Sequence, residues 1–169
     1  MNLNFQDLIP SDFSDDSRVW VYQANRSFTL EESLRIEDLL KDFCVDWNSH
    51  GDSVKGYANL FFGQFIIIMA DETRTKVGGC STDISVRFIK DIEQEFNVEL
   101  TDRLLLAFVI KENIQLLTLE EINLAIEDTV LTGETTYFNN TILTKKDLMQ
   151  NWIIPLKDSW LAKRIPSFA

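Results

Sequence analysis

The sequence has few of the side chains from which catalytic and metal centres are most often built: its 169 residues include one histidine and two cysteines. Two cysteines in a chain of this length do not form a disulfide framework, so Cys44 and Cys80 are predicted to be free thiols. One histidine and two well-separated cysteines match no paired zinc spacing. We therefore expect no metal site, and no cofactor either.

Long apolar runs and an excess of basic residues are also missing. The longest apolar runs, 65–70 and 104–110, are far shorter than the roughly 20 residues that a membrane-spanning helix needs, so no membrane span is predicted. The formal charge is −11, because 27 acidic residues outnumber 16 basic ones. Such a charge repels phosphate backbones, so we expect no nucleic-acid partner. Residues 1–5 lack the basic and apolar parts of a secretion signal, and we expect a cytoplasmic protein.

The first 16 residues carry acidic side chains, no basic ones, and no helical or strand periodicity. The segment 1–16 is therefore predicted to be an irregular acidic N-terminal arm. Residues 17–169 contain no Pro/Gly/Ser-rich linker and are predicted to form a single domain. Four apolar residues would lay the arm along that domain: Phe5, Leu8, Ile9 and Phe13.

The first part of the predicted domain alternates strands with amphipathic helices. Thr29 and Glu32 form a capping box, which marks the start of a helix. Apolar residues then recur every three or four positions, as on one face of a helix. Gly63-Gln64 separates two apolar runs and is typical of the turn in a β-hairpin. These patterns predict strands over 19–23, 57–62 and 65–70, a helix over 30–48, and a second helix that ends near Asn97.

The second part supplies the last strand of the predicted sheet and a C-terminal extension. An apolar run over 104–110 is short enough for a buried strand, and an extra strand is predicted over 114–119. The order βαββαβ predicts an α+β fold, a ferredoxin-like two-layer sandwich with an antiparallel sheet and both helices on one face. The helical extension begins at about 120, and Trp152 and Trp160 are expected to dock it. Its predicted parts are a helix capped by Thr118, an edge strand over 135–138, a helix from Thr144 to Gln150, and a last turn over 158–163.

The best candidate for a binding site is the segment after the most apolar strand, residues 77–83. Two glycines stand before a predicted helix there, and residue types that often cap helices follow them. Backbone amides at such a helix start can hold an anion. The candidate ligand-binding residues are Gly78, Gly79, Cys80, Ser81, Asp83 and Arg87.

The predicted topology adds the only histidine to this site. In a βαββαβ sandwich, the end of the first helix and the start of the second lie at the same edge of the sheet. Imidazole can take the proton of a nucleophile, and a helix start lowers the pKa of a thiol. Cys80 or Ser81 with His50 is therefore a candidate catalytic pair. The residues gathered at this edge would be His50, Gly51, Asp71, Glu72, Cys80, Ser81 and Asp83.

Each of these residues also has a purely structural interpretation. His50 can donate to unpaired carbonyls in the last turn of the first helix. Ser81 and Asp83 are residue types that cap any helix. Cys80 can serve as a small side chain where a strand and a helix pack closely. The sequence leaves both interpretations open.

The sheet face opposite the predicted helices is a further candidate surface. A two-layer sandwich leaves this face bare unless something covers it. We expect the C-terminal tail or a second subunit to do so, and the second case would make the protein a homodimer. Aromatic residues that could lie there are Trp20, Tyr22, Tyr57, Phe61, Phe62 and Phe65.

Four segments, 17–23, 47–51, 79–90 and 155–160, resemble the marks of a small bacterial family of unknown function whose members often carry the label "ABC transporter ATPase". The resemblance spans nearly the whole chain after the arm, and the label implies ATP hydrolysis. A phosphate-binding P-loop needs a lysine and then a serine or threonine after its second glycine. The nearest stretch, Gly51 to Gly56, is followed by tyrosine and alanine. We therefore expect no ATPase activity.

Two hypotheses about function follow. The leading one is a non-catalytic cytoplasmic protein that binds a partner protein or a small anionic ligand. The alternative is a hydrolase or transferase in which Cys80 or Ser81 attacks, His50 is the base, and helix amides with Arg87 stabilise negative charge.

Overall fold

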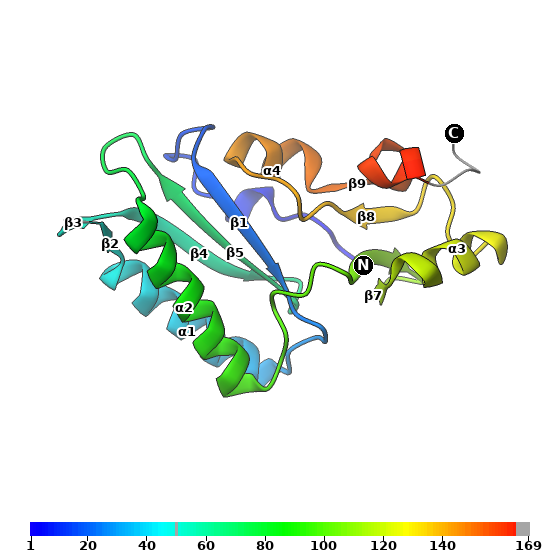
Figure 1. Ribbon diagram of the computed structural model, residues 1–169, viewed down its shortest axis with the longest axis horizontal. Helices are drawn as coiled ribbons and strands as arrows, with labels where there is room; N and C mark the ends of the chain where they lie inside the picture. Colours follow the sequence, from blue (N-terminus) through cyan, green and yellow to red (C-terminus); the bar gives the residue numbers. More distant parts are fainter. Residues whose placement is uncertain (50, 165–169) are drawn as a thin grey trace. The chain divides into compact units, whose positions relative to one another are not determined.

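The computed structural model describes residues 1–49 and 51–164. In this part of the chain the fold is α+β, with four α-helices and two antiparallel sheets of three and four strands, besides one short two-stranded pair (Figure 1). No helix there is long and apolar enough to cross a membrane. Contacts divide the chain into two compact units. The first unit contains residues 3–101 and 141–149, and the second contains residues 1–2, 102–140 and those from 150 onward.

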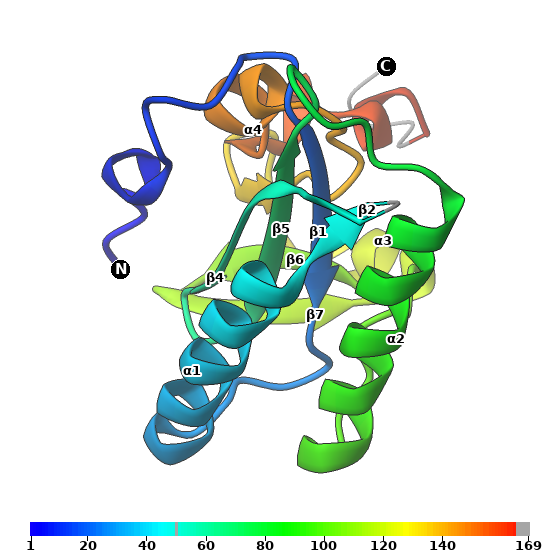
Figure 2. The same cartoon turned by 90° about the vertical axis from the view of Figure 1, so that its left-hand side faces the viewer.

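The first unit is built on a three-stranded antiparallel sheet with the order β1-β5-β4. Its two long helices lie side by side on one face of that sheet (Figure 2). The elements are β1 (Arg18–Gln23), α1 (Leu30–Asp46), β2 (Asn48–Ser49), β3 (Asp52–Ser53), β4 (Lys55–Phe61), β5 (Phe65–Asp71) and α2 (Gly79–Phe96), preceded by a 3-10 turn at Gln6–Leu8.

Local sequence signals explain where these helices begin and end. Thr29 caps α1, because its hydroxyl accepts from the Glu32 amide at 3.2 Å while the Glu32 carboxylate accepts from the Thr29 amide at 2.8 Å. α2 ends where Asn97 takes a left-handed conformation with φ 49°. The predicted two-residue turn of the β4–β5 hairpin is wrong, since Phe61 pairs with Phe65 and three residues lie between them.

The core of the first unit lies between the sheet and the two helices. Alternate strand residues face the helices, so β5 contributes Ile66, Ile68 and Ala70. The Phe43 ring stacks on the Phe88 ring, with 4.4 Å between centroids, and this contact joins the two helices. The remaining buried members of this core are Tyr22, Ala24, Phe28, Ile36, Leu40, Trp47, Val54, Leu60, Val77, Ile89, Ile92, Val98 and Leu100.

The N-terminal arm packs on β4 side chains that alternate with those facing the core. The Phe5 ring meets the Phe61 ring edge-on at 6.3 Å, and the Phe13 ring meets the Tyr57 ring in the same way at 6.4 Å. Phe5, Ile9 and Phe13 are buried, whereas Leu8 is exposed and contributes only its carbonyl, which accepts from the Tyr57 hydroxyl at 2.8 Å. The arm thus occupies a face that we expected the tail or a second subunit to cover.

Residues 141–149 belong to the first unit although they lie far along the sequence. The Leu143 carbonyl accepts from the Val19 amide at 2.9 Å, so this segment runs beside β1. The helix α4 (Lys145–Asn151) follows, as predicted from Thr144, whose hydroxyl accepts from the Asp147 amide.

The second unit contains a four-stranded antiparallel sheet with the order β7-β6-β8-β9. Trp152 and Trp160 hold its C-terminal part, since their indole groups donate to the Asn140 side chain and the Tyr137 hydroxyl, each at 3.2 Å. The elements are β6 (Leu106–Ile110), β7 (Asn113–Leu117), α3 (Leu119–Glu127), β8 (Thr136–Phe138), β9 (Ile153–Pro155) and the 3-10 turns Leu156–Asp158 and Trp160–Arg164.

The placement of the predicted last strand is corrected by this sheet. β6 pairs with β7 and β8 and not with the three-stranded sheet, so the ferredoxin-like topology is not confirmed. The run 104–110 continues directly into a tight hairpin, in which Lys111 and Glu112 have φ of 49° and 61°. The hairpin therefore gives β6 an antiparallel neighbour, β7, that follows it directly in the sequence. The apolar content of a strand does not indicate which sheet the strand joins. β8 is also not an edge strand, because β9 lies beside it.

Candidate functional site

The first turn of α2 lacks the side-chain cap that begins α1 and α3. Thr29 and Thr118 each form a capping box with the glutamate three residues later, whereas the N-cap of α2 is Gly78 and makes no side-chain cap hydrogen bond. No acidic residue stands in the first turn of α2. The backbone N–H groups of this turn have no intrahelical partners, so they can donate to an anion.

The predicted site residues do not all face this turn. Gly79 and Cys80 are exposed, and a Cβ built on Gly79 would meet no atom within 4 Å. Ser81 is 0% exposed, and its hydroxyl has no hydrogen-bond partner among the described residues. Asp83 and Arg87 are exposed. Arg87 lies eight residues beyond Gly79, which is about 12 Å along the axis at ~1.5 Å per residue.

His50 lies outside the described residues, so its predicted proximity to Cys80 stays a prediction. The segment before it does approach α2. The Trp47 indole donates to the Ser81 carbonyl at 3.0 Å, and β2 contacts α2. This hydrogen bond also helps to hold Ser81 in the core, where a dissolved ligand does not reach it.

The two thiols have different surroundings. Cys80 is exposed at the start of α2, whereas Cys44 is partly buried against the core. Burial raises the pKa of the Cys44 thiol to about 11, which keeps it protonated at neutral pH. Neither cysteine forms a disulfide. Within residues 1–49 and 51–164 there is no cluster of three or more side chains that could hold a metal ion.

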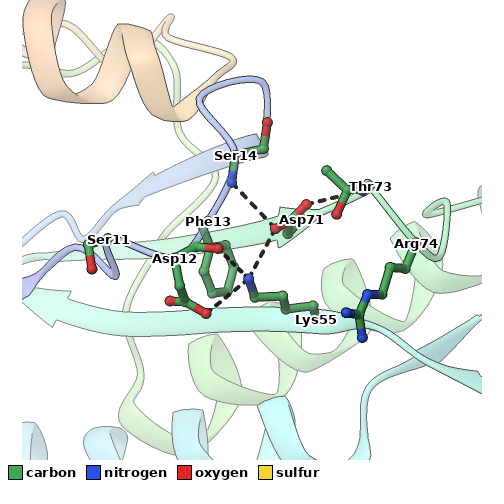
Figure 3. A pocket seen from close by; sticks show the side chains of 8 residues that line it. All are labelled: Ser11, Asp12, Phe13, Ser14, Lys55, Asp71, Thr73 and Arg74. Carbon is green, nitrogen blue, oxygen red and sulfur yellow. Dashed lines mark hydrogen bonds and ion pairs between the residues drawn. The ribbon is translucent and has the colours of Figure 1, made fainter.

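A polar pocket of about 620 Å³ lies under the arm, at the end of the sheet where β4 begins and β5 ends (Figure 3). It combines two cations, two carboxylates and three hydroxyl groups with one aromatic ring. The lining residues are Ser11, Asp12, Phe13, Ser14, Lys55, Asp71, Thr73 and Arg74.

Lys55 is the centre of this pocket. Its ammonium donates to the Asp12 carbonyl at 2.5 Å and lies 3.0 Å from the Asp12 carboxylate and 3.2 Å from the Asp71 carboxylate. It also lies 4.5 Å from the centroid of the Phe13 ring. The hydrogen bond to Asp12 raises the pKa of Lys55, although partial burial opposes this, and the contact with Asp71 adds to it. Lys55 therefore joins the arm to the sheet.

Asp71 forms the inner wall of the pocket, with its side chain 4% exposed. Burial alone would raise the pKa of this carboxyl, but hydrogen bonds from Thr73, Lys55 and Ser14 outweigh it and lower the pKa to about 2. The amides of Thr73 and Ser14 donate to the carboxylate at 3.1 and 3.4 Å. Asp71 is thus charged at neutral pH and joins the sheet, the loop after β5 and the arm.

The loop between β5 and α2 has its own internal support. The Glu72 carboxylate accepts from the Val77 amide at 2.8 Å, and the Arg18 guanidinium donates to the Val77 carbonyl at 3.4 Å. This loop connects the pocket to the first turn of α2. Of the residues predicted to gather at this edge, Asp71 and Glu72 therefore have structural partners, and Cys80 is exposed.

Sequence reasoning missed Lys55, Arg74 and the serines of the arm. One signal could have found the first of these. In a hairpin closed between Phe61 and Phe65, Lys55 stands opposite Asp71, as the observed register shows. The arm residues could not be found in this way, because no periodic pattern fixes the path of an irregular segment.

Comparison of the chain with family models, curated proteins and solved structures found no match. The resemblance to a bacterial family therefore stays a prediction.

Proposed function

We propose that this protein is a non-catalytic binding protein that holds a small anionic ligand at the N-terminus of α2. The observation that supports this is the uncapped first turn, with exposed Gly79 and Cys80, in a chain whose α1 and α3 both carry capping boxes. In those two helices a glutamate of the chain occupies the position that an anion would take. At α2 the corresponding space is open to solvent.

The strength of such a site is limited but measurable. Partial positive charge at a helix N-terminus stabilises a nearby anion by about 0.3–1 kcal/mol when exposed, and hydrogen bonds to charged groups add about 1.5–3 kcal/mol each. A phosphate that accepts from two or three amides therefore reaches an affinity near the millimolar range, about −4 kcal/mol. The exposed carboxylate of Asp83 works against tighter binding.

The experiment is a titration of the protein with inorganic phosphate, followed by the backbone amide NMR signals of Gly79 and Cys80. The decisive variant is Gly78→Asp, which supplies a carboxylate of its own to the same amides. Gly78 has extended backbone with φ −83°, so an aspartate fits there. As an N-cap residue, aspartate is more favourable than glycine by a few tenths of a kcal/mol, so we expect the variant to keep the fold.

We expect saturable shifts at Gly79 and Cys80 in the wild-type protein and their loss in the Gly78→Asp variant. Gln94→Glu is the matched control, because it adds the same charge at an exposed position of α2, about 22 Å away at ~1.5 Å per residue. Phosphate binding that survives in Gly78→Asp, or that is absent from the wild type, contradicts the proposal. If the wild-type protein does not bind phosphate, the binding of a partner protein is what remains of the hypothesis.

The alternative function, a hydrolase or transferase, is supported only by the exposure of Cys80 at the helix start. The Ser81 version has no open path to a substrate, because that hydroxyl is buried. Rapid labelling of Cys80 by iodoacetamide near neutral pH that is lost in His50→Asn favours the enzyme. Slow labelling that does not depend on His50 rules out the thiol mechanism.

Three further expectations stay predictions. They are the absence of ATPase activity, the cytoplasmic location and the homodimer. Turnover of ATP above background contradicts the first. The arm already covers part of the sheet face on which a dimer was predicted, so sedimentation of the purified protein decides whether two copies associate.

A further inference from the structure

The charged groups of the pocket under the arm differ in how far contacts within the protein satisfy their hydrogen-bonding capacity. The ammonium of Lys55 has three donors, and its three oxygen contacts account for all of them. The buried Asp71 carboxylate already accepts from the amides of Ser14 and Thr73 and from Lys55. These two groups are therefore satisfied and form the fixed wall of the pocket.

The rim of the pocket differs from this wall. Arg74 lines the pocket and is exposed, and no hydrogen bond or ion pair of its side chain occurs among residues 1–49 and 51–164. The Asp12 carboxylate is 71% exposed and contacts Lys55 through one oxygen. An ionised carboxylate accepts up to about four hydrogen bonds, so Asp12 retains capacity. Figure 3 shows Asp12 and Arg74 on either side of Lys55.

We propose that this pocket binds a small zwitterion, of the chemical class of a free amino acid, with its carboxylate on Arg74 and its ammonium on Asp12. A guanidinium matches a carboxylate through two parallel hydrogen bonds, and a carboxylate accepts from an ammonium. The hydroxyl groups of Ser11, Ser14 and Thr73 border the same space. This site is separate from the first turn of α2.

Charge balance favours a zwitterion over a simple anion or cation. Lys55 and Arg74 carry two positive charges, and Asp12 and Asp71 carry two negative ones, so the formal charge of the pocket is zero. A simple anion would be attracted by Arg74 but repelled by the exposed Asp12 carboxylate. A simple cation would be attracted by Asp12 but repelled by Arg74. A ligand with both charges satisfies both sides at once. The volume of about 620 Å³ lies inside the range of roughly 300–1,000 Å³ found for small-molecule pockets.

The test is a titration of the isotope-labelled full-length protein with each of the twenty standard amino acids, followed by the amide signals of Ser14, Thr73 and Arg74. For an amino acid that binds, two analogues are then titrated: the amine without the carboxylate and the acid without the ammonium. We expect saturable shifts at these amides, and at least tenfold weaker binding for either analogue.

Two single variants locate the site. Arg74→Gln and Asp12→Asn are each expected to weaken binding at least tenfold. Lys76→Gln is the matched control, because it removes an exposed positive charge from the same loop outside the pocket and should change affinity less than twofold. Asp12→Asn also weakens the attachment of the arm, so Arg74→Gln, which has no such structural contact, is the decisive variant.

The proposal is overturned if no amino acid shifts these amides at millimolar concentration, or if Arg74→Gln binds as tightly as the wild type. Equal binding of the acid without the ammonium also overturns it, since the pocket would then be an anion site. Gly78→Asp should leave amino-acid binding intact. Failure at this pocket and failure at α2 are therefore distinguished.

Discussion

Replacing Asp71 by asparagine removes the negative charge that joins the sheet, the arm and the loop after β5. The substitution keeps the shape of the side chain. The amides of Ser14 and Thr73 donate to different carboxylate oxygens, Oδ2 and Oδ1, so the single amide oxygen of an asparagine can accept from only one of them. It removes one of these two hydrogen bonds and the ion pair with Lys55, whose ammonium lies 3.2 Å from the carboxylate. The effect of the charge is separated from that of the lost hydrogen bond by its dependence on pH.

The size and pH dependence of the effect follow from the lowered pKa. The pKa of Asp71 falls from 3.8 to about 2 on folding. At about 1.4 kcal/mol per pKa unit, the charged form contributes about 2 kcal/mol to the free energy of unfolding. Because the folded pKa is below the unfolded one, this contribution is complete above about pH 5. It declines as the pH falls and is lost below about pH 2.

The assay is urea unfolding of the wild type and of Asp71→Asn at several pH values between 7 and 2. We expect the variant to be at least about 2 kcal/mol less stable at pH 7, with the difference shrinking by about that amount toward the acid end. Other carboxylates also lose stability in acid. Glu32, whose pKa the Arg26 guanidinium and the Thr29 amide lower to about 2, is one of them. Their effect is common to both proteins and cancels in the difference.

A constant difference between the two proteins across this pH range refutes the reasoning, because the loss would then come from packing or from the lost hydrogen bond and not from charge. A difference near zero at pH 7 also refutes it. In that case the exposed Lys55 ammonium would be equally stable with Asp12 alone.

Two further predictions concern the core and the thiols. A Cβ on Gly56 would lie 2.7 Å from the Trp47 ring, so Gly56→Ala should lower the free energy of unfolding by about 1–3 kcal/mol, as overpacking does. Gly79→Ala is the control with open space, and equal losses in urea unfolding would contradict the packing argument. Iodoacetamide at pH 8 should label Cys80 in the folded protein and Cys44 only after unfolding, because burial raises the pKa of Cys44 to about 11. Equal labelling rates, measured by mass spectrometry, would contradict this.

Local elements could be predicted from the sequence because their signals are short-range. The capping box at Thr29 involves residues three positions apart. The hairpin of β4 and β5 was also predicted, although its turn has three residues and not the two expected. The end of α2 at Asn97 likewise depends on one residue that tolerates a left-handed backbone. Such signals depend on few residues, so they do not require the path of the rest of the chain to be known.

Long-range placement could not be predicted in the same way. The pattern of residues 104–110 specifies a buried strand but not the sheet that it joins, because either edge would bury the same apolar side chains. The candidate anion site depends on Gly78 and Gly79, which the sequence did identify. The pocket depends on the arm, whose Asp12 reaches Lys55 across 43 positions. No local rule specifies that contact.

The hydrogen bond between the Ser14 amide and the Asp71 carboxylate spans 57 positions and has a consequence for biosynthesis. A ribosome adds about 5–20 residues per second, so the arm waits roughly 3–11 seconds before the aspartate that receives it has even been polymerised. Until β4 has been polymerised, the rings of Phe5 and Phe13 lack the strand on which they finally rest. During that time the nascent polypeptide exposes the aromatic surface of its arm, to which a chaperone can bind.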